Sequence, residues 1–228
     1  MRTRVDRVAG VDVGGAKKGF HAVALQGRVL SAKLTTCSVA AVVAWCREQR
    51  VSAIGIDAPS RWSLTGRARA CESELALVGM STFSTPSRAV GEVHPFYGWM
   101  MNGIALYRGL ASYFPLYDGR SPVVEPFCFE TFPQASACSL TGRKLSAARK
   151  RSDRRRLLEE NGLAADSLTN IDEIDAALCA LSARHVLAGC FNAYGDGAEG
   201  VILVPTRLTS CSACITTADG SPQFISPY

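Results

Sequence analysis

The first part of the chain alternates between apolar runs and short polar breaks at the spacing of strands and turns. The run "RVAGVDVGG" (7–15) is apolar until Asp12 and a glycine pair, which is typical of a buried strand that ends in a turn. Two further runs, "GFHAVALQ" (19–26) and "RVLSAKLT" (28–35), meet at Gln26-Gly27. The pattern therefore predicts three consecutive strands of a meander.

The periodicity then changes to that of a helix and returns to that of a strand. After Ser38, the segment "VAAVVAWCREQR" (39–50) carries apolar residues at helical spacing. The next run, "VSAIGIDAP" (51–59), reads as a buried strand that ends at Asp57 and is stopped by Pro59. The order strand-strand-strand-helix-strand indicates an antiparallel hairpin set joined to a crossover connection.

The remaining three quarters of the chain are less regular. Residues 60–120 are rich in glycine, proline and aromatic residues, with one predicted helix, and are interpreted as an inserted cap. Later elements are a strand around Glu130, a basic helix at about 146–161, a long helix at about 171–188 and a last strand at 199–205. We expect an α/β domain over residues 1–205, with a mixed sheet of about five strands flanked by helices. The aperiodic, Ser/Thr-rich residues 206–228 predict a flexible tail.

The long helix begins with an unusual group of acids, in "NIDEIDAALCALSARHVLAG" (170–189). Asn170 is a good N-cap, and Glu173 stands where a capping box places its second residue. The helix dipole further favours acids in the first turn, which accounts for Asp172 and Glu173. Asp175 lies on a face of small residues suited to close packing on a sheet. A carboxylate buried there is costly unless it is paired or binds a cation.

Three other acids stand at the ends of predicted strands, namely Asp12, Asp57 and Glu130. Strand ends are where sites gather in α/β folds. If these acids converge with Asp175, their mutual repulsion favours raised pKa values or bound divalent cations, and hard oxygen ligands suit Mg²⁺ or Mn²⁺. Each acid also has a local explanation, because Asp12 and Asp57 could form turns and Glu130 could pair with the basic segment.

The charge of the chain is unevenly distributed. The segment "RKLSAARKRSDRRR" (143–156) holds eight basic residues and one acid, a local charge of +7, which leaves about −2 for the rest of a chain with net charge +5. A basic segment on a near-neutral body indicates a polyanionic partner such as nucleic acid, or a solvated helix that pairs with Glu159 and Glu160.

The chain contains no run of 18 or more apolar residues, so the sequence predicts no membrane-spanning helix. The nine cysteines are odd in number and scattered along the chain, which argues against a disulfide framework and favours a cytoplasmic location.

Several of these pieces together resemble domain-of-unknown-function family 429, described as predicted nucleases of ribonuclease H-like fold and related to Holliday-junction resolvases. The matching pieces are "GVDVGG", "GIDAP", "ETFP", the basic segment before "LLEENGL", and "NIDEIDAALCALSA". The resemblance implies a metal-dependent nuclease that uses Mg²⁺ or Mn²⁺. The residues that it implies are Asp12, Asp57 and Asp175 as metal ligands, Asp172 or Glu130 as a fourth acid, and Lys144 and Lys150 as phosphate contacts. Glu130 is not part of the minimal nuclease pattern, but we expect it to assist catalysis, and we expect Arg154 to join the two lysines in contacting the phosphate backbone.

Two other functions remain open from the sequence. A nucleic-acid or protein-binding module could keep this fold and some of the acids without catalysis. The segment "GVDVGGAKKG" (10–19) is also similar to the first phosphate-binding loop of sugar kinases and actin-like ATPases, but those proteins need two such domains. We interpret His21 and His185 as structural. The sequence does not decide between DNA and RNA, and it leaves a homodimer open.

Overall fold

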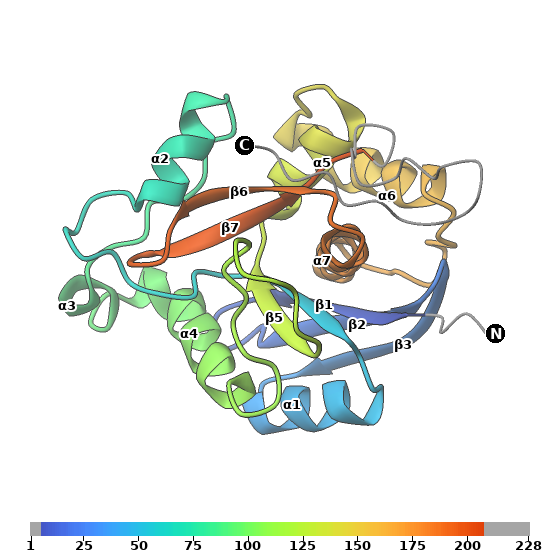
Figure 1. The fold of residues 1–228 in the computed structure, drawn as a ribbon, viewed down its shortest axis with the longest axis horizontal. Coiled ribbons are helices and arrows are strands. Elements are labelled where there is room, and N and C mark those ends of the chain that lie inside the picture. The colour runs from blue at the N-terminus through green and yellow to red at the C-terminus, as the bar shows by residue number, and fades with distance from the viewer. Residues whose placement is uncertain (1–5, 208–228) are drawn as a thin grey trace.

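The computed structural model describes residues 6–207 and contains one seven-stranded mixed sheet with strand order β3-β2-β1-β4-β5-β7-β6 (Figure 1). The strands are β1 (Arg7–Val13), β2 (Phe20–Gln26), β3 (Val29–Thr36), β4 (Ala53–Asp57), β5 (Phe127–Glu130), β6 (Phe191–Asp196) and β7 (Gly200–Pro205). Strands β1, β4, β5 and β7 run parallel, while β2, β3 and β6 pair antiparallel with their neighbours. The predicted meander and crossover are therefore confirmed.

Helices cover both faces of the sheet. The helices are α1 (Val39–Glu48), α2 (Ala70–Leu77), α3 (Arg88–Gly91), η1 (Pro95–Tyr97), α4 (Gly98–Leu110), α5 (Pro133–Thr141), η2 (Ala147–Arg149), α6 (Lys150–Glu160) and α7 (Ile171–Leu187). Apolar residues of α5, α6 and α7 pack on one face, and those of α1 and α4 pack on the other. Within residues 6–207, no helix combines the length and the apolar character that crossing a bilayer requires.

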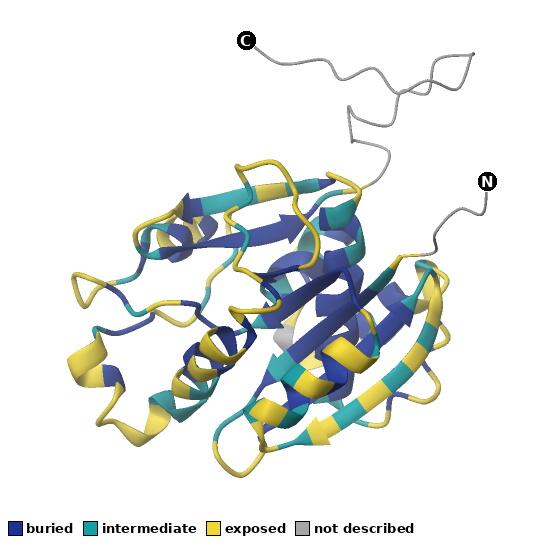
Figure 2. Ribbon diagram, turned by 60° about the horizontal axis from the view of Figure 1, so that its bottom comes forward, coloured by how far each residue is buried: buried dark blue, intermediate teal, exposed yellow. Residues whose placement is uncertain are grey.

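The strands distribute their side chains to these two faces by simple alternation. In β1, Val8 packs in the core on the α7 side, whereas Ala9 and Val11 pack in the core with α1 and α4. Both faces of β1 and β2 are buried, while the edge strand β3 alternates between half-buried and exposed residues (Figure 2). The alternation fixes which polar residues of the central strands point toward α7.

Helix α7 lies unusually close to the centre of the sheet. Gly10 of β1 is paired in register with Gly55 of β4. A Cβ atom on Gly10 would lie 2.0 Å from the carbonyl oxygen of Ala176, and one on Gly55 would lie 2.4 Å from that of Cys179. Only glycine leaves room for the helix backbone at these two positions. The pair therefore sets α7 directly on β1 and β4.

The prediction of about five strands was wrong. The sheet has seven strands, six of which correspond to segments that the sequence marked as strands. The strand without such a segment is β6, which pairs antiparallel with β7 through the turn at residues 197–199. Its sequence "FNAYGD" has a mostly half-exposed burial pattern and lacks the apolar run that marks the central strands. Edge pairing with β7, a tertiary contact, makes this segment a strand.

The segment interpreted as a cap contributes directly to the sheet layers. Leu106, Tyr107 and Leu110 of α4 belong to the core on the α1 side of the sheet. Residues 70–77 form α2, whose Cys71 and Leu75 pack on β7 residues. Most of the predicted tail, residues 208–228, lies outside the described residues, while Thr206 donates its N–H to the carbonyl of Cys190 at 2.9 Å.

Candidate active site

The centre of the site is a row of three polar residues on adjacent strands. Asp12 of β1 is the register partner of Asp57 on β4 and of His21 on β2. Register partners on neighbouring strands project from the same face of a sheet, with Cβ atoms about 4.5–5.5 Å apart. Gly10 and Gly55, two residues earlier, face α7, so the two aspartates face α7 as well.

Helix α7 brings a third carboxylate to this row. Asp175 is 7% exposed and is bound by the guanidinium of Arg154 from α6 through Nη1 and Oδ1. Arg154 also donates from Nη2 to the side-chain oxygen of Gln134 at 2.7 Å. The inward acid of α7 is therefore paired with a buried cation of the basic segment.

The acids of the first turn of α7 have other partners. Asp172 binds Lys18 with both oxygens, at 3.0 and 3.1 Å, and its Oδ2 lies 3.8 Å from Nε2 of His21. Asn170 caps the helix by accepting the N–H of Glu173 at 2.8 Å, as predicted. Glu173 itself accepts the N–H of Thr169 and pairs with Lys33 at 2.9 Å. These contacts fix the N-terminus of α7 against β2 and β3.

The carboxylates of Asp12, Asp57 and Asp175 repel one another in a poorly hydrated part of the protein. Burial, followed by the charges of Asp175 and Asp172, raises the pKa of Asp12 to about 8. Burial and the charges of Asp12 and Asp175 raise the pKa of Asp57 well above its ordinary value. Burial also raises the pKa of Asp175, against the opposing effect of Arg154. Asp175 acts on both Asp12 and Asp57, and Asp12 acts on Asp57, so the three acids belong to one electrostatic cluster.

The donor set suits a hard divalent cation. Within residues 6–207, the half-buried carboxylates of Asp12 and Asp57 make no hydrogen bond or ion pair. No three Asp, Glu, His or Cys side chains of that same range converge closely enough to form a complete metal cage. Mg²⁺ is commonly held by one or two carboxylates, water and substrate phosphate oxygens, so a free carboxylate pair fits such an ion.

Glu130 lies on the opposite face of the sheet from this cluster. Its register partner on β4 is Ile56, which belongs to the core on the α1 and α4 side. There, Arg69 binds both oxygens of Glu130, at 2.5 and 3.0 Å, and the N–H of Ser60 donates to it at 2.8 Å. The structure therefore brings Asp12, Asp57, Asp172 and Asp175 together and places Glu130 in a separate buried ion network.

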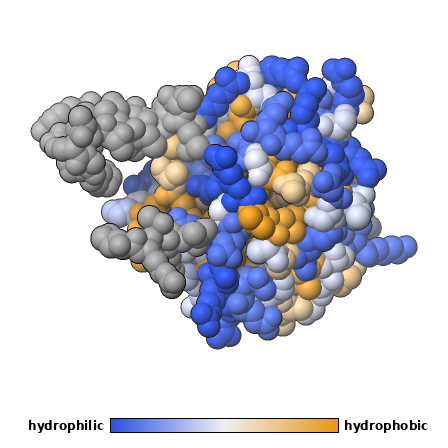
Figure 3. All heavy atoms as spheres, turned by 90° about the vertical axis from the view of Figure 1, so that its right-hand side faces the viewer, coloured by the Kyte–Doolittle hydropathy of each residue, from blue (hydrophilic) through white to orange (hydrophobic). Residues whose placement is uncertain are grey.

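The basic segment divides into supporting and exposed residues. Arg154 is buried at the site, and Arg151 and Arg155 bind backbone carbonyls of the loop before α7. Lys144 and Lys150 are exposed, and the charge of Lys150 lowers the pKa of Asp175. Hydrophilic side chains dominate the molecular face seen in Figure 3, the side toward which α6 lies in Figure 1. Two of the three predicted phosphate contacts are therefore free to meet a polyanion.

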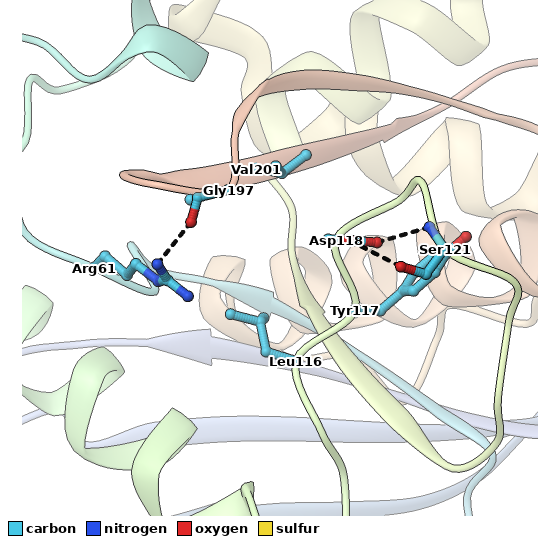
Figure 4. A pocket seen from close by; sticks show the side chains of 8 residues that line it. Arg61, Leu116, Tyr117, Asp118, Ser121, Gly197 and Val201 are labelled. Carbon is cyan, nitrogen blue, oxygen red and sulfur yellow. Dashed lines mark hydrogen bonds between the residues drawn. The ribbon is translucent and has the colours of Figure 1, made fainter.

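A hollow of about 350 Å³ lies away from the acids (Figure 4). Its lining residues are Arg61, Leu116, Tyr117, Asp118, Ser121, Gly197, Gly200 and Val201. Its main polar groups are already engaged, because Asp118 accepts hydrogen bonds from Arg120 and Ser121, and Arg61 donates to the carbonyl of Gly197 at 2.7 Å. The hollow shares no lining residue with the aspartate cluster and offers no comparable chemistry.

Two residues of the site were not recognised in the sequence. His21 was interpreted as structural, yet it stands in the row beside Asp12, and its Nδ1 lies 3.2 Å from the hydroxyl of Thr35. In each of the two strands an aspartate follows a glycine by two residues, at Gly10–Asp12 and Gly55–Asp57, which indicates that the two aspartates lie on the face that the glycines share. The predicted pairing of β1 with β2 could then have placed His21 beside Asp12. Gln134 carried no such signal, because its segment was not predicted as a helix.

Comparisons with known proteins identify one family and two solved structures of low sequence identity. A family model described as "Protein of unknown function (DUF429)" matches residues 10–199, a range that contains every candidate site residue. No curated protein matches the chain. The structure of RuvC from Thermus thermophilus is similar at 16% identity and a TM-score of 0.45, over 80% of this chain and 96% of that one. A structure of T. thermophilus RuvC in complex with Holliday junction substrate is similar at 15% identity and a TM-score of 0.41, over 79% and 92%.

Proposed function

We propose a function for this chain, which belongs to the DUF429 family of proteins of unknown function, as its sequence predicted. Its proposed function is that of a metal-dependent nuclease of ribonuclease H-like type. The observation that carries this proposal is the pair of carboxylates of Asp12 and Asp57, which have no partner among residues 6–207 and are held in register at the ends of parallel strands. Asp175, on the helix that packs over them, completes the acidic cluster.

Asp12 and Asp57 are the residues proposed to hold Mg²⁺ or Mn²⁺. Two carboxylates on one face of a rigid sheet need little rearrangement to share a cation. Their raised pKa values mean that a cation replaces protons that the pair otherwise retains. When bound, such an ion supplies positive charge that polarises the phosphate and stabilises the leaving oxygen.

Asp175 is proposed to accept a proton from the attacking water. Its Oδ1 is held by Arg154, while its Oδ2 accepts no hydrogen bond within residues 6–207. Burial raises the pKa of this carboxyl, which brings it closer to the range useful for a general base. In the overall reaction the water oxygen bonds to phosphorus, the bond from phosphorus to the leaving sugar oxygen breaks, and the water proton passes through Asp175 to that leaving oxygen.

Nucleic acid is the substrate class proposed, because exposed cations stand beside the cluster. Lys150 begins α6 and lies close enough to act electrostatically on Asp175. Lys144 is exposed in the same basic segment. Cations beside a carboxylate site favour the approach of a phosphate backbone that the acids alone would repel.

The test is cleavage of a labelled panel of single-stranded, duplex and branched DNA and RNA with Mg²⁺, Mn²⁺ or EDTA. We expect metal-dependent cleavage by the wild type and its loss in Asp12→Asn and Asp57→Asn. The control Asp166→Asn removes an exposed carboxylate away from the cluster and should cleave normally. Removal of one essential group from a cooperating site costs several orders of magnitude in rate, so the contrast will be large.

Other outcomes separate the remaining functions. Binding of the panel without cleavage by any form, measured by fluorescence anisotropy, would replace the nuclease with a non-catalytic module. Cleavage that survives in both aspartate variants would exclude the Asp12–Asp57 pair as its centre.

A further inference from the structure

Four aromatic side chains form an exposed cluster at the N-terminal end of α4. This aromatic cluster consists of Phe83 from the loop after α2 and of Phe96, Tyr97 and Trp99 around the start of α4. The ring of Phe83 lies 5.9 Å from that of Phe96 and 6.3 Å from that of Trp99, and Phe96 lies 5.1 Å from Tyr97. Phe83 is 65% exposed and Phe96 is 52% exposed, so both contact other rings while more than half of each remains in solvent.

Packing alone does not account for this exposure. Trp99 is partly buried and packs against the core on the α1 and α4 side of the sheet, which anchors the aromatic cluster. Phe83 and Phe96 add little to that core, because they lie on its solvent side. Their rings meet edge to face, at 69°, a geometry that leaves ring faces open for a further stacking partner. Large apolar side chains that are exposed together mark a binding surface more often than single ones do.

The aromatic cluster lies at the same edge of the sheet as the candidate active site. Asn102, one helical turn after Trp99, donates from Nδ2 to the carbonyl of Gly14 at 2.8 Å, and Gly14 stands two residues after the acid of β1. A Cβ on Gly103 would lie 2.3 Å from the Cβ of Ala58, the residue that follows the acid of β4. The start of α4 is therefore held against the ends of the two strands that carry the central acids.

The contact through Asn102 also joins the aromatic cluster to a basic turn. Residues 14–19 form this turn, in which the N–H of Gly14 donates to the carbonyl of Gly19 at 2.7 Å. The turn carries Lys17, which is exposed, and Lys18, which binds Asp172. An exposed aromatic surface and an exposed cation thus flank the same strand ends.

We propose that the aromatic cluster binds an unpaired nucleobase of the substrate, which stacks on Phe83 and Phe96. This inference rests on the proposed function for the identity of the strand. Aromatic rings that stack on bases, together with cations that follow the backbone, are the means by which proteins hold single-stranded nucleic acid. The exposed charge of Lys17 favours a polyanion over an apolar peptide or a neutral lipid surface. A base inside a duplex is already stacked on both sides, so we expect the chain to prefer single-stranded or branched nucleic acid.

The experiment compares two labelled ligands on the full-length chain by fluorescence anisotropy, in EDTA so that no cleavage occurs. One ligand is a single-stranded oligothymidylate, and the other is an abasic oligomer of the same length and charge. We expect the wild type to bind the oligothymidylate about tenfold more tightly or better, because only that strand can stack. This comparison needs no variant.

Variants then assign the preference to the aromatic cluster. The double variant Phe83→Ala with Phe96→Ala should lose the preference and bind both ligands with the affinity that the wild type has for the abasic oligomer. Phe96→Leu keeps an apolar side chain without a ring and should weaken the preference, whereas Phe96→Trp keeps a ring and should retain it. Leu77→Ala is the matched control, because Leu77 is an exposed apolar residue of α2, at 87% exposure, outside the aromatic cluster.

Several results would overturn the inference. One is equal affinity of the wild type for the two ligands, and another is an unchanged preference in the double variant, with circular dichroism showing that it is folded. A double variant that loses affinity equally for both ligands would show that the aromatic cluster contacts no base. With no base preference, a wild-type dimer that dissociates in the double variant, measured by sedimentation velocity, would assign the surface to a second copy of the chain. With no base preference, vesicle binding that the double variant loses would assign the surface to a membrane.

These results are distinguishable from failure of the proposed function. A base preference that depends on Phe83 and Phe96, without cleavage of any nucleic acid in Mg²⁺ or Mn²⁺, would keep the inference and remove the nuclease. Cleavage that depends on Asp12, with no base preference in binding, would keep the nuclease and remove the inference.

Discussion

Gly10 and Gly55 are register partners on β1 and β4, and together they seat the backbone of α7 on the sheet. This close approach decides where Asp175 lies relative to Asp12 and Asp57. Gly10→Ala should destabilise the fold by an amount at or above the upper end of the about 1–3 kcal/mol typical of overpacked cores.

The measurement for Gly10→Ala is urea unfolding followed by circular dichroism. Gly98→Ala is a matched control, because a Cβ at that helical position meets nothing within 4 Å. It should change the free energy of unfolding by at most about 0.5 kcal/mol. Equal stability of the two variants would show that α7 is not held as closely as the structure indicates.

The buried pair of Arg69 and Glu130 should be essential for stability. Arg69→Met leaves the carboxylates of Glu130 and Glu72 buried without their cation, a change that costs about 3–5 kcal/mol. Arg88→Met breaks the exposed pair with Glu92, which is worth about 1 kcal/mol or less. Thermal unfolding of both variants compares them directly, and similar melting temperatures would contradict the buried network.

Asp12→Asn should stabilise the metal-free protein at neutral pH. The pKa of Asp12 is about 8 in the folded chain and near 3.8 when unfolded, so the folded state holds more protons between these values and stability falls as the pH rises through them. Allowing for the partial exposure of Asp12, we expect a gain of about 1–2 kcal/mol at pH 8. Added Mn²⁺ should raise the melting temperature of the wild type and of Asp166→Asn but not of Asp12→Asn. A loss of stability in metal-free Asp12→Asn would argue against repulsion in the cluster.

His185 should make the fold sensitive to mild acid. Burial lowers its pKa below 6.5, and its Nδ1–H donates to the carbonyl of Thr206 at 2.8 Å. Below the ordinary histidine pKa of about 6.5 the unfolded chain binds more protons at this site, so stability is lost as the pH falls from there toward the folded value. His185→Gln keeps a donor for Thr206 and should flatten this part of the pH–stability curve. Parallel curves for the wild type and the variant between pH 7 and 5 would show that His185 does not cause the loss.

Nucleic-acid affinity should depend on salt through Lys144 and Lys150. Replacing both with alanine should reduce the slope of log affinity against log salt by about 0.7–0.9 for each lysine–phosphate ion pair that the variant can no longer form. Arg67 and Arg108 are exposed cations outside the basic segment, and their double alanine variant is the control. Equal slopes for the two double variants, measured by fluorescence anisotropy, would place the binding surface elsewhere.

Much of the central fold was readable from the sequence because local patterns coincide with it. The apolar runs that end at Asp12 and Asp57 are strands β1 and β4, and the capped helix from Ile171 is α7. The strand β6 and the helix α5 were missed. In β6 the apolar pattern is weak, and in α5 the small residues of "PQASACSLT" acquire their burial only by packing against α7 and β7.

Local sequence patterns are enough to place acids at two strand ends and on an inward face of a late helix. Which of these acids meet depends on how the strands and helices pack. Glu130 pairs in register with Ile56, the residue before Asp57, so its side chain points to the opposite face of the sheet from Asp57. The register of β2 places His21 beside Asp12. Arg154 reaches Asp175 because α6 packs against α7, which joins residues 21 positions apart. Local periodicity specifies strands and helices, whereas face, register and ion pairing depend on interactions that form when those elements pack.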